Sequence, residues 1–134
     1  MNFGNWFTGK TAPLTGAPAI RRTKTYSAQT GYVYQYRYEG QRPFRGGGDG
    51  GVEFVFSVSG GRRHGVQTAV RVPAAAIRAW EEEHSRQLSS TERYAIAKMA
   101  LFQAFDERPA PERMTDQIIV RPADLQAILE TLDI

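Results

Sequence analysis

The sequence has no cysteine among its 134 residues. This absence excludes disulfide bonds, thiolate metal sites and a cysteine nucleophile. No stretch approaches the roughly 20 consecutive apolar residues that a membrane-spanning helix needs. The first residues also lack the basic and apolar regions of a secretory signal. We therefore expect a soluble, cytoplasmic protein that has no membrane partner.

Histidine is scarce as well, with two residues in the chain. His64 lies in a predicted turn, and His84 follows Glu81 at a spacing that puts both side chains on one helix face. Helical carboxylate metal sites need this motif more than once, and no second copy is present. The hydrolase motifs Gly-x-Ser-x-Gly and His-Glu-x-x-His are also missing. We therefore assign no catalytic residue, no metal and no cofactor, although an enzyme of unknown reaction stays open.

The segment Gly4–Thr11 matches the phosphate-loop pattern G-x-x-x-x-G-K-[ST]. A phosphate loop needs a buried strand before it and a helix after it. Here only three residues precede the pattern, and Pro13 and Gly16 follow where the helix should run. We therefore interpret residues 1–21 as an irregular N-terminal arm and residues 22–134 as a single domain.

The most distinctive feature is a row of tyrosines at alternate positions. In an extended strand alternate side chains share a face, so these rings lie in one line. A buried tyrosine needs a partner for its hydroxyl, so we expect the row to run from core to rim, with one or two rings exposed. The row sits in a predicted strand over residues 22–39, with a bend or bulge at Gly31, and it comprises Tyr32, Tyr34, Tyr36 and Tyr38.

The remaining patterns predict an α+β fold. Apolar residues alternate over residues 52–59 and 66–72, and short links join these strands to the first, which is typical of a three-stranded antiparallel meander. A short fourth strand is predicted over residues 117–120. Helices are predicted over residues 73–86, 90–107 and 122–132, from prolines at two helix starts and a Ser-x-x-Glu capping box at the third.

The helix over residues 90–107 carries an apolar arc that covers well over half of its circumference. Such a helix is buried on more than one side. It is therefore either the central helix of the domain, or a helix that packs on the sheet and also on a partner subunit.

Charge divides the chain into two halves. Residues 1–72 hold ten Lys or Arg against three acids, whereas residues 73–134 hold seven against eleven. A basic half next to an acidic half indicates an anionic partner, or two copies that meet basic to acidic.

Three functions remain open. The first is a non-catalytic protein-interaction or self-associating module, for example a homodimer. The second is a nucleic-acid or polyanion binder, in which exposed tyrosines stack on bases. The third is a small-molecule-binding protein or an enzyme. The candidate ligand or polyanion surface consists of Tyr34, Tyr36, Arg37, Tyr38, Arg42, Arg45, Arg62 and Arg63. Whether helices cover the tyrosine face decides if this surface can act as a stacking platform.

Overall fold

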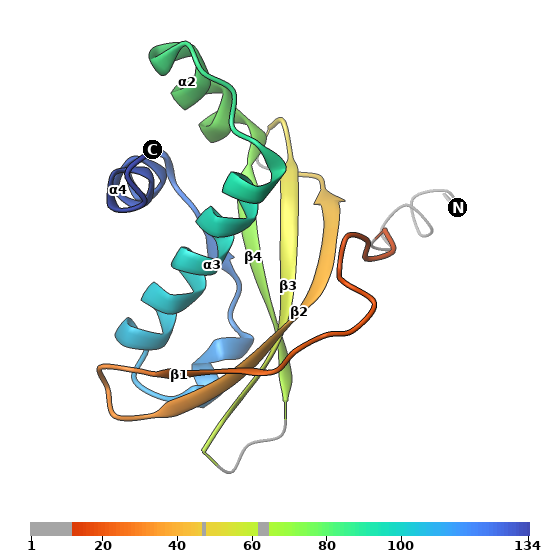
Figure 1. The fold of residues 1–134 in the computed structure, drawn as a ribbon, viewed down its shortest axis with the longest axis vertical. Coiled ribbons are helices and arrows are strands. Elements are labelled where there is room, and N and C mark those ends of the chain that lie inside the picture. Colours follow the sequence, from red (N-terminus) through yellow and green to blue (C-terminus); the bar gives the residue numbers. More distant parts are fainter. Residues whose placement is uncertain (1–11, 47, 62–64) are drawn as a thin grey trace, which may run out of the picture.

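The computed structural model describes residues 12–46, 48–61 and 65–134. The fold is α+β, as the sequence predicts: helices pack against one face of a curled sheet (Figure 1). The sheet has five strands in the order β1-β2-β3-β4-β5. The strands are β1 (Lys24–Ser27), β2 (Val33–Phe44), β3 (Gly51–Gly60), β4 (Val66–Pro73) and β5 (Ile118–Ile119). The helices are α2 (Ala74–His84), α3 (Ser90–Glu107) and α4 (Pro122–Thr131), with a short 3₁₀ helix, η1 (Pro111–Thr115), before β5.

Two features of the sheet differ from the prediction. The strand expected over residues 22–39 is a hairpin, in which β1 pairs antiparallel with β2. The chain reverses because Gly31 adopts φ +97°, a left-handed conformation that suits a turn, and the amide of Ala28 donates to the carbonyl of Tyr32. The sheet is also mixed, because β5 returns through the helices and pairs parallel with β4.

A β-bulge interrupts β2 at Glu39. Tyr38 pairs with Phe56 of β3, and Gly40 pairs with the preceding residue, Val55, so Glu39 is an extra residue. An extra residue reverses which side chains face which side of the sheet beyond it. Gln41 therefore faces the same side as Tyr38, and Arg42 faces the opposite side.

Helix α3 covers the tyrosine face of the sheet. Tyr34 is fully buried and stacks on Phe105 of α3, with 4.3 Å between the ring centroids. Tyr36 is buried too, and it meets the Phe102 ring edge to face, with 5.5 Å between the ring centroids. Tyr32 lies beside the hairpin turn and is 38% exposed. The row thus runs from core to rim, as predicted.

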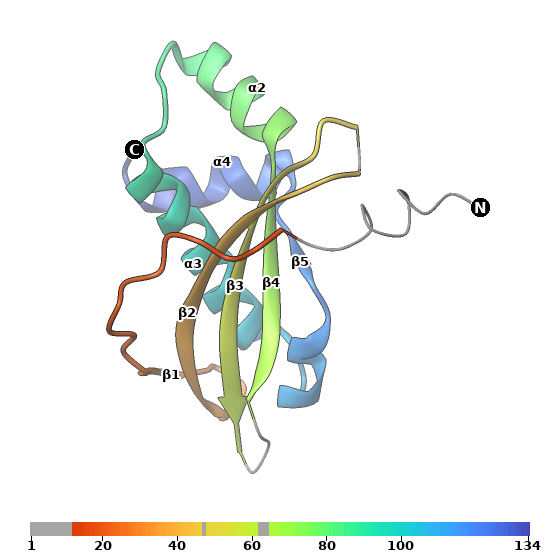
Figure 2. The same ribbon diagram turned by 90° about the vertical axis from the view of Figure 1, so that its right-hand side faces the viewer.

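The rest of the apolar arc of α3 is used within the chain. One side of α3 packs on the sheet and another packs on α4, which also lies against α2 (Figures 1 and 2). The helix begins at the predicted capping box, in which the amide of Glu92 donates to Ser89 and the amide of Ser89 donates to the Glu92 carboxylate. None of the helices among the described residues is both long and apolar enough to cross a membrane.

The face of the sheet without helices carries a row of charges across three strands. Arg42 of β2, Glu53 of β3 and Arg71 of β4 are paired in register, and both arginines lie 2.8 Å from the Glu53 carboxylate. The Glu53 side chain is 6% exposed. Burial alone would raise the pKa of Glu53, but the hydrogen bonds and charges of Arg71 and Arg42 outweigh it and lower the pKa.

Replacing Glu53 tests the contribution of this row to stability. Because folding lowers the pKa of Glu53 below its ordinary value of 4.5, the pairing stabilises the fold above that pH and is lost as the pH falls through the folded-state pKa. Glu53→Gln is expected to cost about 3 kcal/mol of unfolding free energy at pH 7, because it leaves two arginines without their anion. Below pH 4.5 the difference from the wild type is expected to shrink.

The measurement is urea denaturation at a series of pH values between 7 and 3. Glu82→Gln serves as the control, because Glu82 is exposed on α2. A Glu53→Gln variant with wild-type stability at pH 7 would show that the row contributes nothing.

Candidate ligand pocket

Residues 12–23, called the strap below, cross the helix-free face of the sheet and then run beside the outer edge of β2 (Figure 2). A bridge between Thr15 and Gln41 fixes one point of the strap, with amide-to-carbonyl hydrogen bonds of 2.9 and 2.8 Å. The strap and β2 are in close contact at Gly40, where an added Cβ would lie 2.9 Å from the carbonyl oxygen of Thr15. Gly40 also has φ +129°, a backbone conformation that favours glycine. Both this conformation and the lack of space for a Cβ therefore require glycine at this position.

The β-bulge supplies a second fixed point. Arg21 of the strap lies 2.9 Å from the carboxylate of Glu39, which also accepts hydrogen bonds from Ser57 and Arg37. The hydrogen bond from Ser57 lowers the pKa of Glu39 more than burial raises it, and the two arginines lower it further. Glu39 is therefore an anion that holds the strap at the edge of the sheet.

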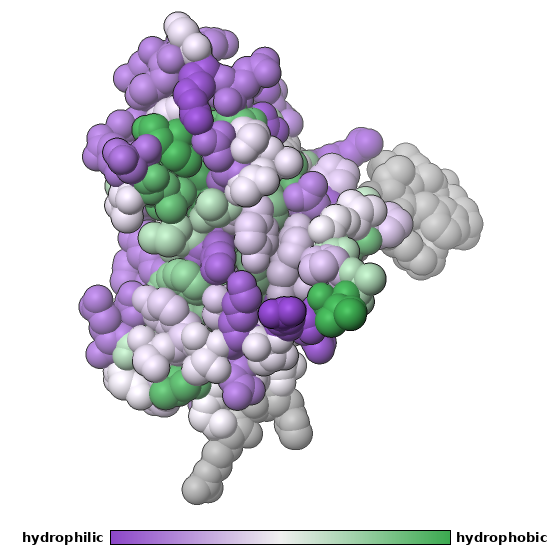
Figure 3. Space-filling model, viewed as in Figure 1, coloured by the Kyte–Doolittle hydropathy of each residue, from purple (hydrophilic) through white to green (hydrophobic). Residues whose placement is uncertain are grey.

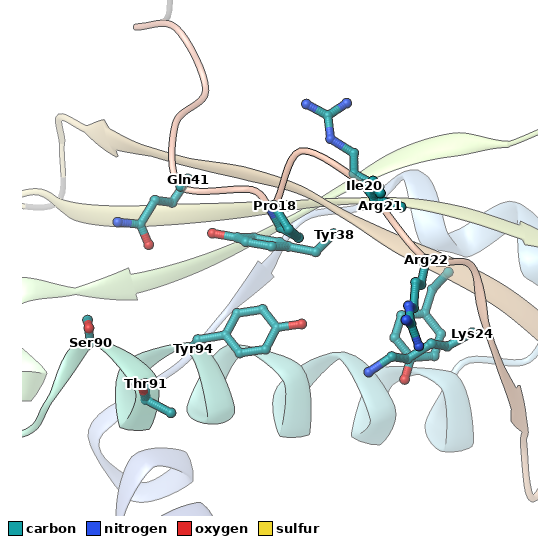
Figure 4. A pocket seen from close by; sticks show the side chains of 12 residues that line it. Pro18, Ile20, Arg21, Arg22, Lys24, Tyr38, Gln41, Ser90, Thr91 and Tyr94 are labelled. Atoms are coloured by element: carbon teal, nitrogen blue, oxygen red, sulfur yellow. The ribbon is translucent and has the colours of Figure 1, made fainter.

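A cavity of about 630 Å³ lies between the strap and α3 (Figure 4). One wall is the strap, the opposite wall is the first part of α3, and the side chains of β2 form the floor. Its lining consists of Gly16, Pro18, Ile20, Arg21, Arg22, Lys24, Tyr36, Tyr38, Gln41, Ser90, Thr91 and Tyr94.

The middle of the pocket is aromatic. The rings of Tyr38 and Tyr94 are 4.8 Å apart, and both side chains are half-buried. Burial, with a smaller contribution from Tyr94, raises the pKa of Tyr38 to about 12. Burial also raises the pKa of Tyr94. Both hydroxyls are therefore neutral at physiological pH and can donate or accept hydrogen bonds.

The two ends of the pocket differ in charge. Arg22 and Lys24 lie at one end, and the neutral polar side chains of Gln41, Ser90 and Thr91 lie towards the other (Figure 4). Gln41 reaches the lining because the bulge at Glu39 turns it to the side of Tyr38.

Those residues of the sequence-predicted surface that the structure describes do not form one continuous surface. Tyr34 and Tyr36 are buried beneath α3, and Tyr38 lines the pocket. Arg37 and Arg42 face the opposite side of the sheet. There Arg37 forms an ion pair with Glu39, and Arg42 forms one with Glu53. The exposed Arg45 follows the end of β2. The Gly4–Thr11 pattern, Arg62, Arg63 and His64 lie outside the described residues.

The Glu81 and His84 pair does not converge on a common point. Glu81 accepts hydrogen bonds from the amide of Leu88 and from Arg93. The His84 ring stacks on Trp80, and its Nδ1 lies 2.9 Å from the Trp80 carbonyl oxygen. Within residues 12–46, 48–61 and 65–134, no three acidic or histidine side chains gather as a metal site.

Sequence reasoning missed most of the pocket. Two lining residues, Arg22 and Lys24, lie where the sequence predicts only the start of a strand. Three others belong to a helix whose apolar pattern predicts only packing: Ser90, Thr91 and Tyr94. Only the cluster of three cations just before the tyrosine row, Arg21, Arg22 and Lys24, offered a signal.

Comparison with protein-family models, with curated proteins and with solved structures finds no match to this chain. The chemistry of the pocket therefore has to be inferred from its own residues.

Substitution at Gly40 is expected to detach the strap. Gly40→Ala places a methyl group against the Thr15 carbonyl and strains a positive φ. Gly46→Ala is a matched control, because Gly46 also has a positive φ, +113°, but has open space around its Cβ position. We expect trypsin to cleave at Arg21, Arg22 and Lys24 several times faster in Gly40→Ala than in Gly46→Ala. Equal cleavage rates would contradict the role given to this contact.

Proposed function

We propose that this chain binds a small, ring-containing molecule in the pocket between the strap and α3. The observation that carries the proposal is the cavity itself, about 630 Å³ in volume, with Tyr38 and Tyr94 at its centre. Small-molecule sites in proteins commonly enclose about 300–1,000 Å³. The volume is therefore enough for a ligand of one or two rings with polar substituents.

The lining also has the character of a binding site. Such sites combine aromatic and apolar walls with a few polar groups that fix the orientation of the ligand. Here Pro18 and Tyr38 supply flat apolar surface, and the Tyr94 hydroxyl points along the pocket (Figure 4). A planar ring gains from offset or edge contacts with tyrosine rings.

The burial of the tyrosine row weighs against the stacking-platform alternative. Base stacking on a sheet needs ring faces that are open to solvent. Tyr34 and Tyr36 are 0% and 5% exposed, and α3 covers them. Two of the arginines expected around the platform, Arg37 and Arg42, lie on the other face of the sheet.

Self-association receives less support than the pocket does. The wide apolar arc of α3, which suggested a partner subunit, packs on the sheet and on α4. Hydrophobic residues on the face shown in Figure 3 form separate areas divided by hydrophilic ones. Among the described residues, the large exposed apolar side chains come from separate segments: Ile20, Tyr32 with Val33, Ile119 and Ile134. A homodimer stays a separate prediction that light scattering would test.

An NMR titration tests the proposal. A set of one- and two-ring compounds, both neutral and charged, is added to ¹⁵N-labelled protein. At least one compound is expected to shift the amide signals of residues 16–24, 36–41 and 90–94 together, with saturation. Shifts confined to other regions, or the absence of saturable shifts with the whole set, would contradict the proposal.

A variant that fills the pocket provides the control. Thr91→Trp places an indole in the cavity from the first turn of α3, where the residue is exposed and packing tolerates it. Ala79→Trp adds the same side chain at an exposed position of α2 that is absent from the lining. We expect Thr91→Trp to weaken binding at least tenfold and Ala79→Trp to leave it unchanged. Equal effects of the two variants would show that binding occurs elsewhere.

A further inference from the structure

The two cations at one end of the pocket have no acidic partner among the described residues. Arg22 and Lys24 line the cavity, and neither forms an ion pair with a described carboxylate. Arg21 differs from them, because its side chain points away from the pocket and pairs with Glu39 (Figure 4). Most arginines of the described chain do have such a partner, so the unpaired charges at this end stand out.

A third cation lies beside Lys24. Lys98 is one turn beyond Tyr94 on α3, and its ammonium group sits 5.7 Å from the centre of the Phe102 ring. Burial lowers the pKa of Lys98, and the positive charge of neighbouring Lys24 lowers it further. Cations from the strap, β1 and α3 are thus gathered at one place, at an electrostatic cost that a bound anion would remove.

The acids on the adjoining elements are already engaged with other groups. Glu39 of β2 binds Arg21, Arg37 and Ser57. Asp106 of α3 accepts hydrogen bonds from the Tyr26 hydroxyl and the Gln29 amide. Glu92, near the other end of the pocket, accepts from Ser89 and Arg86. None of these carboxylates neutralises Arg22 or Lys24.

From this arrangement we infer that the ligand carries an anionic group, a phosphate or a carboxylate, which binds Arg22 and Lys24 while its ring lies against Tyr38 and Tyr94. This inference rests on the proposed function and adds the charge and the orientation of the ligand. The part of the ligand remote from the anionic group then lies towards Gln41, Ser90 and Thr91, where neutral hydrogen-bonding groups fit best.

Matched pairs of probes separate the charge from the ring. One pair is adenosine 5′-monophosphate with adenosine, and the other is 1-naphthaleneacetate with 1-naphthaleneacetamide. Dissociation constants are measured by NMR titration at physiological salt, where non-specific charge attraction is screened. We expect the anionic member of at least one pair to bind ten times more tightly than its neutral partner. The pair with the larger ratio distinguishes phosphate from carboxylate recognition.

Variants of equal charge locate the effect. Arg22→Gln combined with Lys24→Gln is expected to reduce anion affinity at least tenfold and to leave the neutral probes unchanged. The control combines Arg113→Gln with Arg121→Gln, which removes the same charge from exposed positions whose arginines pair with Asp116 and Asp124. The control is expected to change anion affinity less than twofold.

The outcomes distinguish this inference from the function on which it rests. Equal binding of neutral and anionic probes at the pocket would overturn the inference and leave the proposed function standing. Equal losses in the two double variants would overturn the inference too, because attraction would then follow net charge alone. If neither member of either pair shifts the pocket amides, the inference fails, and the wider set of ring compounds decides the proposed function.

Discussion

The stack of Phe105 on Tyr34 is the contact on which the rest of the structure depends. With Phe102 against Tyr36, it fixes α3 along the tyrosine face of β2. One stacked pair and one edge-to-face pair of rings favour specific geometries, so they set both the depth and the direction of the helix. The first turns of α3 then lie away from the strap, and this separation leaves the pocket with the half-buried rings of Tyr38 and Tyr94 on its floor and wall.

The bulge at Glu39 links the sheet to the strap. It places a carboxylate where Arg21 can bind it, and it turns Gln41 into the pocket. Gly40, the next residue, lets the backbone of Thr15 approach β2 closely enough to bridge it. The extra residue Glu39 and the adjacent Gly40 therefore hold two points of the strap, and the bulge also turns one polar group into the lining, which is consistent with the frequent use of bulges near functional sites.

The sequence predicts the elements better than their arrangement. Alternation and capping located β3, β4 and α3 to within a residue or two, because these signals depend on neighbours along the chain. The hairpin at Gly31 was not predicted, because a glycine inside a strand pattern fits either a bulge or a turn. The parallel pairing of β5 was not predicted either, because a two-residue strand has no sequence pattern that indicates its direction relative to β4. The pocket could not be predicted from the sequence, because its cations and its tyrosines come from segments up to about 70 residues apart. Only tertiary packing brings Lys24 beside Lys98.

The central claim is that α3 covers the tyrosine row and leaves the pocket at one end of it. Nuclear Overhauser effects between aromatic side chains, in protein labelled at tyrosine and phenylalanine, measure this most directly. The account predicts strong effects between the rings of Tyr34 and Phe105 and between those of Tyr38 and Tyr94. If both pairs gave none in the folded protein, α3 would lie elsewhere, and the pocket with the functions assigned to it would have no structural basis.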